Sequence, residues 1–298
     1  MENRLRAIST TAVLVLAVAN LAPGQGQVRA IAELQRMEPQ VGTIGKNGSR
    51  IGRGIVWAES SGTVVAEFAK TCDTAVIPVG CVEMHGPQNP TGTDSINVER
   101  ICRLAAEQEP FIILPTIYYN INDQMMSYPG TIAIPHRVLI DTWRAIFKEC
   151  ARNGFKRIVP VCGHGGSEEP LIVAQAEVLQ EAAEGAPIDY QVFRIQRFGL
   201  ATAPELSGHG GGAETARVMD ALPGLVDLSK ATGEGPYIRP VAEPATYRVP
   251  WIRNVPKGYQ GHPELATREL GEKLNRELAA RLAEIIRKIK AVDLKTSP

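Results

Sequence analysis

The stretch VIPVGCVEMHGPQNPTGTD, residues 76–94, decides how the rest of the chain is interpreted. It begins as a short apolar, β-branched run that is typical of a buried strand. The run stops at Gly80, and a loop rich in glycine and proline then supplies Glu83, His85 and Asp94. Because alternate residues of an extended segment point to the same side, we expect Glu83 and His85 to share a face. A buried strand that ends in an imidazole and two carboxylates indicates a functional site.

Strand-like and helix-like segments alternate on both sides of this stretch. Such alternation predicts a mainly parallel sheet flanked by helices on both faces, a three-layer α/β/α fold. The expected strands are 74–80, 111–120, 155–163 and 188–198, and the expected helices are 60–72, 95–109, 135–154, 168–184, 213–222 and 263–291. We expect residues 57–298 to form a single catalytic domain, preceded by an irregular lead-in at 31–56.

Residues 1–30 differ in composition from the rest of the chain. Arg4 and Arg6 precede an apolar run of about sixteen residues, which a polar, glycine-rich segment follows. This order is typical of a secretory signal peptide, and the run is short for a membrane span of about 20 residues. We therefore expect export to the periplasm or the medium, with an uncertain cleavage site and no stable membrane insertion after processing. An uncleaved anchor or a buried helix is the alternative.

The overall charge argues against nucleic-acid binding. Thirty-two lysines and arginines balance 32 aspartates and glutamates, and the chain has no basic stripe. The five cysteines are an odd number and form no CxxC pair. One disulfide can form in an exported protein, but apolar neighbours favour buried free thiols for most of them.

Residues 233–261 form a long segment without periodicity. Its prolines and its aromatic residues Tyr237, Tyr247 and Trp251 suit a loop or lid. We expect it to close over a substrate and set specificity, with a subunit contact as the alternative.

Two later strand-like segments also lead to histidines. His164 follows the strand expected at 155–163, while His209 and Glu214 follow a loop after the next strand. Ligands of open α/β sheets bind at the carboxyl ends of the strands. Two imidazoles with three carboxylates and no thiolate suit Zn²⁺, Mn²⁺ or Fe²⁺. The alternative is that the histidines make ordinary hydrogen bonds and that Asp94 caps a helix starting at Ser95.

The opening stretch resembles the pattern LPVGxxExHGPxxPxxxD of the creatininase (creatinine amidohydrolase) family. Four further segments resemble family segments in the same order and extend the likeness over about residues 57–290. They are YPGTIAI at 128–134, GFKRIVPVCGHGGSEEP at 154–170, GHGGGAETARVMDALPGLVDLSKA at 208–231 and GYQGHPELATRELGEKL at 258–274.

The resemblance implies two divalent metal ions per chain, as Zn, Mn or Fe. Asp94 would bridge both ions, Glu83 and His164 would bind one, and His85 and Glu214 the other. Creatininase has a carboxylate where this chain has Gly166. Glu214 is therefore assigned to that role, with Glu168 as the alternative. The resemblance also implies a homo-oligomer, with a hexamer as one candidate.

Several positions depart from the family pattern. Cys162 and Ser167 replace asparagines, Gln124 and Met125 replace a frequent Glu-His pair, and His262 replaces an aspartate. The expected metal ligands are kept while the residues around them differ. This favours a small-molecule amide substrate other than creatinine.

The expected reaction is hydrolysis of a linear or cyclic amide. A hydroxide bridging the two ions would attack the carbonyl carbon, and His209 would transfer the proton that the leaving nitrogen requires. Two alternatives stay open. One is hydrolysis of an ester, a C–C bond or a carbohydrate ring at the same metals, and the other is an exported, non-catalytic binding protein. Cys162 beside His164 is a poor candidate nucleophile, because sequence neighbours rarely face each other as a Cys–His pair must.

Overall fold

A computed structural model describes residues 50–197, 202–231 and 250–294. Its centre is a six-stranded sheet with strand order β1-β2-β4-β3-β5-β6, and all neighbouring pairs except β1–β2 are parallel. The strands are β1 Arg50–Ile51, β2 Gly54–Val56, β3 Thr74–Val79, β4 Ile112–Ile113, β5 Arg157–Cys162 and β6 Gln191–Val192. The predicted, mainly parallel sheet is confirmed.

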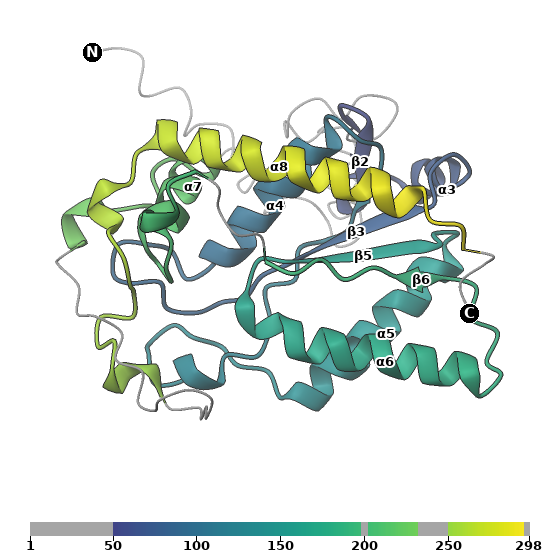
Figure 1. The fold of residues 1–298 in the computed structure, drawn as a ribbon, viewed down its shortest axis with the longest axis horizontal. Helices are drawn as coiled ribbons and strands as arrows, with labels where there is room; N and C mark the ends of the chain where they lie inside the picture. Colours follow the sequence, from purple (N-terminus) through teal and green to yellow (C-terminus); the bar gives the residue numbers. More distant parts are fainter. Residues whose placement is uncertain (1–49, 198–201, 232–249, 295–298) are drawn as a thin grey trace, which may run out of the picture. The chain divides into compact units, whose positions relative to one another are not determined.

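Helices cover both faces of this sheet (Figure 1). α4 and α8 pack on one face, where they share an apolar core with Val76, Val159 and Val161. α3, α5 and α6 pack on the other face, around Ala75 and Ile77. The helices are α3 Gly62–Ala69, α4 Thr93–Ala106, α5 His136–Arg152, α6 Glu168–Ala183, α7 Gly212–Ala221 and α8 Arg268–Lys290. The three-layer α/β/α prediction is therefore confirmed.

β3 and β5 form the core of the sheet. They pair in register from Thr74↔Arg157 to Val79↔Cys162. Every residue of β3 is buried, as expected for a parallel strand with helices on both faces. The loops that carry the expected ligands leave the sheet where these two strands end.

Two predicted strands are shorter than expected. β4 stops at Ile113, and after Pro115, which has no N–H to donate, only a single bridge from Ile117 to Val79 continues the pairing. β6 likewise continues only as a bridge from Ile195 to Val161.

The expected irregular lead-in at 31–56 is wrong for its last residues. β1 and β2 form a short antiparallel pair around Gly52, which has φ +54°, and β2 joins the sheet through β4. Strands of two and three residues are too short for periodicity to reveal. The expected signal peptide at 1–30, and Tyr237 and Tyr247 of the expected lid, lie outside the described residues.

The helices of the described segments were compared with what a membrane span requires. None of them combines sufficient length with sufficient apolar character to cross a bilayer. All five cysteines are buried and free, which confirms the interpretation of buried thiols. For Cys162, burial raises the thiol pKa to about 12, so this residue is protonated at neutral pH and is not an activated nucleophile.

Gly271 permits the close approach of α7 and α8. A Cβ at this position would lie 1.9 Å from the backbone oxygen of Ala216, which cannot move without shifting α7. Helix propensity alone would make Gly271→Ala stabilising by about 1 kcal/mol. We expect the clash to prevail and to lower the free energy of unfolding by about 2 kcal/mol. Urea unfolding with an unchanged m-value would measure this. Gly62→Ala is the control because its Cβ would meet nothing within 4 Å, and equal stability of the two variants would contradict the prediction.

Candidate metal centre

The structure brings all six residues predicted from the sequence to one edge of the sheet. Three of them follow β3, one follows β5, and two lie just before or within the first turn of α7. They are Glu83, His85, Asp94, His164, His209 and Glu214, and five of the six are less than 9 % exposed while His209 is partly buried. Side chains from separate strand ends therefore lie together in one place.

Asp94 lies at the centre of the group. Its Oδ1 is 3.2 Å from His85 Nε2, and its Oδ2 is 3.0 Å from His164 Nδ1. α4 begins at Thr93, so Asp94 belongs to the first helical turn and does not cap a helix starting at Ser95. A carboxylate is favoured there because the helix N-terminus carries partial positive charge.

The potential ligands form two groups that share Asp94. In one group, Glu83 Oε1 lies 3.2 Å from His164 Nδ1, and the buried thiol of Cys81 donates to Asp94 Oδ2 at 3.3 Å. In the other group, Glu214 Oε2 lies 3.6 Å from His85 Nε2. Within each group the candidate ligand atoms lie within 4.8 Å of one another. Imidazole and carboxylate donors at this spacing fit divalent zinc, manganese or iron.

The backbone orients each of the three histidines. One ring nitrogen of each imidazole faces a main-chain carbonyl, and the other faces the carboxylates. The carbonyl contacts are His85 Nδ1 to Glu83 at 3.1 Å, His164 Nε2 to Ile121 at 2.9 Å and His209 Nε2 to Met84 at 2.6 Å. Donation to the carbonyl leaves the second nitrogen of a neutral ring as a lone pair aimed at the cluster, which is the arrangement a metal ligand needs.

The carboxylates control the charge of two imidazoles. Burial alone would lower the pKa of His85, but the facing Asp94 outweighs it and raises that pKa to about 9. For His164, Glu83 and Asp94 likewise outweigh burial and raise the pKa to about 10. The pKa of Asp94 is in turn held well below its usual value, against burial, by the two imidazoles. Protons thus supply the positive charge that metal ions would otherwise provide.

His209 has a different environment. Its ring stacks on His85 with a centroid distance of 4.1 Å, and Trp251 contacts it edge-on at 5.0 Å. Burial and the charge of His85 lower the pKa of His209. Its Nδ1, 3.7 Å from Glu83 Oε1, is therefore free to accept a proton at neutral pH. His209 also belongs to a third group of potential ligands, with Glu83 and His85.

The fifth ligand is assigned to Glu214, because no side chain is present at Gly166. A Cβ on Gly166 would lie 2.4 Å from His164 Nε2, so no side chain fits there in this conformation. Glu214 reaches the cluster from α7, and its Oε2 accepts from the N–H of Gly210 at 2.8 Å. Glu168, the alternative ligand, instead accepts from the backbone N–H of Arg197 at 3.1 Å. The geometry favours Glu214 over Glu168.

Two glycines hold the histidine loops in shape. Gly86 and Gly210 follow His85 and His209 with φ of +77° and +62°, a region that other residues rarely adopt. A Cβ on Gly210 would also lie 2.8 Å from the carbonyl oxygen of His85. The backbone conformation therefore explains why glycine follows His85 and His209.

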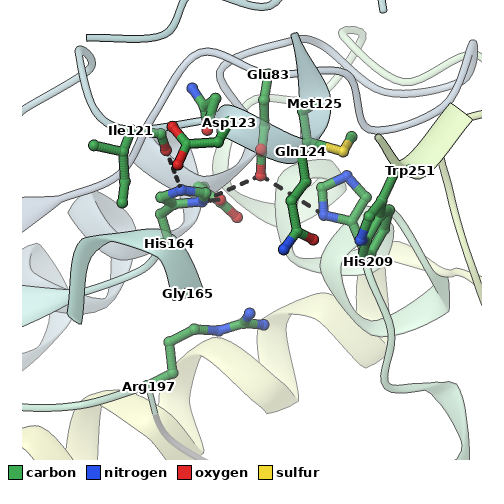
Figure 2. Close-up of a pocket in the computed structure, with 13 residues that line it drawn as sticks. Glu83, Ile121, Asp123, Gln124, Met125, His164, Gly165, Arg197, His209 and Trp251 are labelled. Carbon is green, nitrogen blue, oxygen red and sulfur yellow. Dashed lines mark hydrogen bonds and ion pairs between the residues drawn. The ribbon is translucent and has the colours of Figure 1, made fainter. Parts of the chain in front are cut away.

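A cavity of about 290 Å³ opens beside the cluster (Figure 2). Glu83, Asp94, His164 and His209 line its base. The walls come from residues 121–125, from Gly165 and Gly166, and from Arg197 and Trp251. Trp251 lies at the cavity, in agreement with its expected place near a substrate. Arg197 was not predicted, because it lies within the strand expected at 188–198, whereas β6 ends at Val192.

Comparison with known proteins places the chain in a family of hydrolases. The family model of creatininase, described as creatinine amidohydrolase, matches residues 58–286. The chain belongs to the creatininase family. The family is described by its amidohydrolase activity, and the protein is a hydrolase of this family.

Individual creatininase-family proteins cover most of the chain. Creatinine amidohydrolase of Pseudomonas putida is 24% identical over 251 residues, covering 78% of this chain and 94% of its own. A creatininase crystal structure superposes with a TM-score of 0.70 at 21% identity, covering 80% of this chain and 98% of that one, which shows the shared fold. Further creatininase structures are described as a Zn-Zn type and as a manganese form.

Relatives that carry other names also match the chain. The 3-dehydro-scyllo-inosose hydrolase of Thermotoga maritima is 30% identical over 102 residues, which is 34% of this chain and 33% of that protein.

Proposed function

We propose that the protein is a dinuclear metal-dependent amidohydrolase that cleaves a linear or cyclic amide other than creatinine. The observation that carries the proposal is the pair of ligand groups that share Asp94. Glu83 and His164 would hold one ion, His85 and Glu214 the second, and Asp94 both. Zinc, manganese and iron all suit this set of ligands.

The chemistry divides between the ions and the side chains. Two bound divalent ions lower the pKa of a water and polarise the carbonyl oxygen of an amide. The protein positions the amide in the cavity and limits access of bulk water, with Trp251 as one wall. His209 handles the proton, because its Nδ1 faces the cluster while its Nε2–H is held by the Met84 carbonyl. In this mechanism Nδ1 accepts a proton when the carbonyl is attacked and returns it to the leaving nitrogen.

Replacing His209 with glutamine tests this assignment. The amide of glutamine can keep a contact to the Met84 carbonyl but cannot relay a proton. We expect kcat to fall about a hundredfold, with the metal content unchanged because two complete ligand groups remain. Steady-state kinetics and metal analysis of the same preparation would measure both. Loss of a metal ion in this variant would instead identify His209 as a ligand.

The proposal of a substrate other than creatinine rests on residues around the cluster. Gln124 and Met125 line the cavity, and Cys162 lies beside the loop that carries His164. These positions depart from the family pattern while the expected ligands do not. The substrate is therefore a small amide whose groups match a different set of side chains.

A second candidate is hydrolysis of a bond that contains no nitrogen. The similarity to the inosose hydrolase favours it, since that name denotes action on a carbohydrate-like ring. Both reactions would use the same ligands. An assay for released amine separates them, because only amide hydrolysis liberates one.

Two further parts of the proposal concern the whole protein. The composition of residues 1–30 supports export with cleavage of a signal peptide. The family resemblance supports a homo-oligomer, with a hexamer as one form. Sequencing the N-terminus of the secreted protein and measuring its mass by light scattering test these two points.

Metal analysis of the purified protein is the first test. We expect about two divalent ions per chain, and a large loss of both in a His85→Ala, Asp94→Ala double variant. If the parent protein held no stoichiometric metal even after reconstitution, it would share only its fold with creatininase. An exported binding protein would then be the better description.

A further inference from the structure

Arg197 directs a guanidinium group into the cavity beside the candidate metal centre (Figure 2). It follows β6 at the same edge of the sheet as the cluster, and its side chain is 49 % exposed. Nη2 donates to Glu214 Oε1 at 3.1 Å. Among the described residues, Nε and Nη1 have no hydrogen-bond partner. Arg197 therefore offers several donors to whatever occupies the cavity.

The neighbours of Arg197 leave space for a ligand. A Cβ on Gly165 would lie 3.3 Å from Nη1, so a larger side chain there would press on the guanidinium. Glu168 accepts from the backbone N–H of Arg197, and no ion pair joins it to the guanidinium. Figure 2 shows the neutral amide of Gln124 reaching the cavity from the opposite side, between His164 and His209.

We infer that Arg197 binds the carboxylate of the substrate, so that the enzyme acts on small anionic amides. This inference rests on the proposed amidohydrolase function. A guanidinium binds a carboxylate through paired N–H donors, and such charge-assisted bonds are among the stronger ones in proteins. Because Glu214 links Arg197 to His85, a carboxylate held by Arg197 would place a nearby amide over the cluster.

The charges of the described site fit an anionic substrate. The carboxylates of Glu83, Asp94 and Glu214, with that of Asp123 on the cavity wall, carry four negative charges. Two divalent ions would balance them, which leaves Arg197 as the surplus positive charge. The carboxylate of Asp123, also on the cavity wall, faces His136 Nε2 at 2.9 Å. With both metal ions bound, the cavity would therefore attract a negatively charged group of the substrate. The neutral end of the cavity at Gln124 would accommodate the uncharged part of the substrate.

The competing explanation gives Arg197 a purely structural role. Its ion pair with Glu214 Oε1 holds that carboxylate in place, and a residue that orients a ligand affects metal affinity. The two explanations differ in what Arg197 recognises. A carboxylate-binding residue distinguishes anionic from neutral amides, whereas a residue that only positions Glu214 changes both equally.

The test compares succinamate with succinamide, two amides of similar size that differ by one negative charge. Calorimetric titration of the metal-loaded protein gives both dissociation constants for the parent protein, Arg197→Met, Arg197→Lys and Arg152→Met. Arg152 is the matched control, since it is exposed on α5 and pairs only with Glu149 in the structure described. Metal content is measured for every variant.

We expect the parent protein to bind succinamate about tenfold more tightly than succinamide, equivalent to about 1.4 kcal/mol. Arg197→Met should reduce this preference to below about twofold, Arg197→Lys should keep part of it, and Arg152→Met should keep all of it. These results with unchanged metal content would support the inference.

Four results would overturn the inference. They are equal binding of the two probes by the parent protein, a preference that survives in Arg197→Met, no binding of either probe, and loss of metal in Arg197→Met with equal weakening of both probes. Amide hydrolysis without charge preference would leave the proposed function intact. If the protein preferred succinamate but hydrolysed no amide, Arg197 would still be a carboxylate-binding residue, and the proposed amidohydrolase function would be contradicted.

Discussion

Replacing Asp94 with asparagine is expected to remove both metal ions and to lower kcat/KM by about three orders of magnitude or more. Asp94 is shared by the two ligand groups proposed to hold the ions, with one oxygen toward His85 and the other toward His164. Asparagine keeps the shape but loses the charge and one acceptor oxygen. Metal analysis and amide hydrolysis of the same preparation would measure the effect.

Two further variants make the Asp94 prediction specific. Glu214→Gln should release only the ion held with His85, because Glu214 belongs to one group. Asp189→Asn should bind and hydrolyse normally, since this exposed carboxylate lies away from the cluster and pairs with Lys156. An Asp94→Asn protein that retained two ions would show that the shared carboxylate does not bridge them.

Metal affinity should depend steeply on pH. In the metal-free protein His85 and His164 have pKa values of about 9 and 10, so both carry a proton at pH 7. Each ion must displace one of these protons. The apparent affinity for each ion should therefore rise about tenfold per pH unit between pH 7 and pH 9. Calorimetry in buffers of different ionisation enthalpy would count the released protons, and an affinity independent of pH would contradict the charge assignment.

The same pKa shifts set the stability of the metal-free protein. A raised imidazole pKa stabilises the fold fully below the unfolded value near 6.5, and this contribution disappears as pH rises through 9 and 10. The lowered pKa values of Asp94 and Glu83 act in the opposite direction, and their contribution is lost in acid. Thermal unfolding of the metal-free protein should thus shift to lower temperature above pH 7. The metal-loaded protein should lack this decline.

The sequence was most informative where one local pattern determined the geometry. Glu83 and His85 follow a fully buried strand, so their common destination could be inferred without long-range information. For Asp94 to reach the same place, the loop between His85 and Asp94 has to fold back. The prolines of this loop and Gly86 favour such a turn. The family pattern then connected these residues to His164 and Glu214, which no periodicity could have joined.

Other features depend on contacts that the sequence does not reveal. β2 joins the sheet because β4 provides an edge for it, and β1 pairs in turn with β2, so neither strand follows from its own sequence pattern. The choice of Glu214 over Glu168 depends on how α7 approaches β3. Arg197 lies within the strand expected at 188–198, but β6 ends at Val192 and the Arg197 side chain lines the cavity.

The packing of α7 on α8 has a consequence for how the protein matures. Glu214 lies in the first turn of α7, and Gly271 lets the last long helix of the chain press against that element. During synthesis the residues from Glu83 to His164 leave the ribosome well before α8 does. A nascent chain would thus present at most one of the two ligand groups in final form. Loading of the second ion is expected to wait until α8 has left the ribosome and packed on α7.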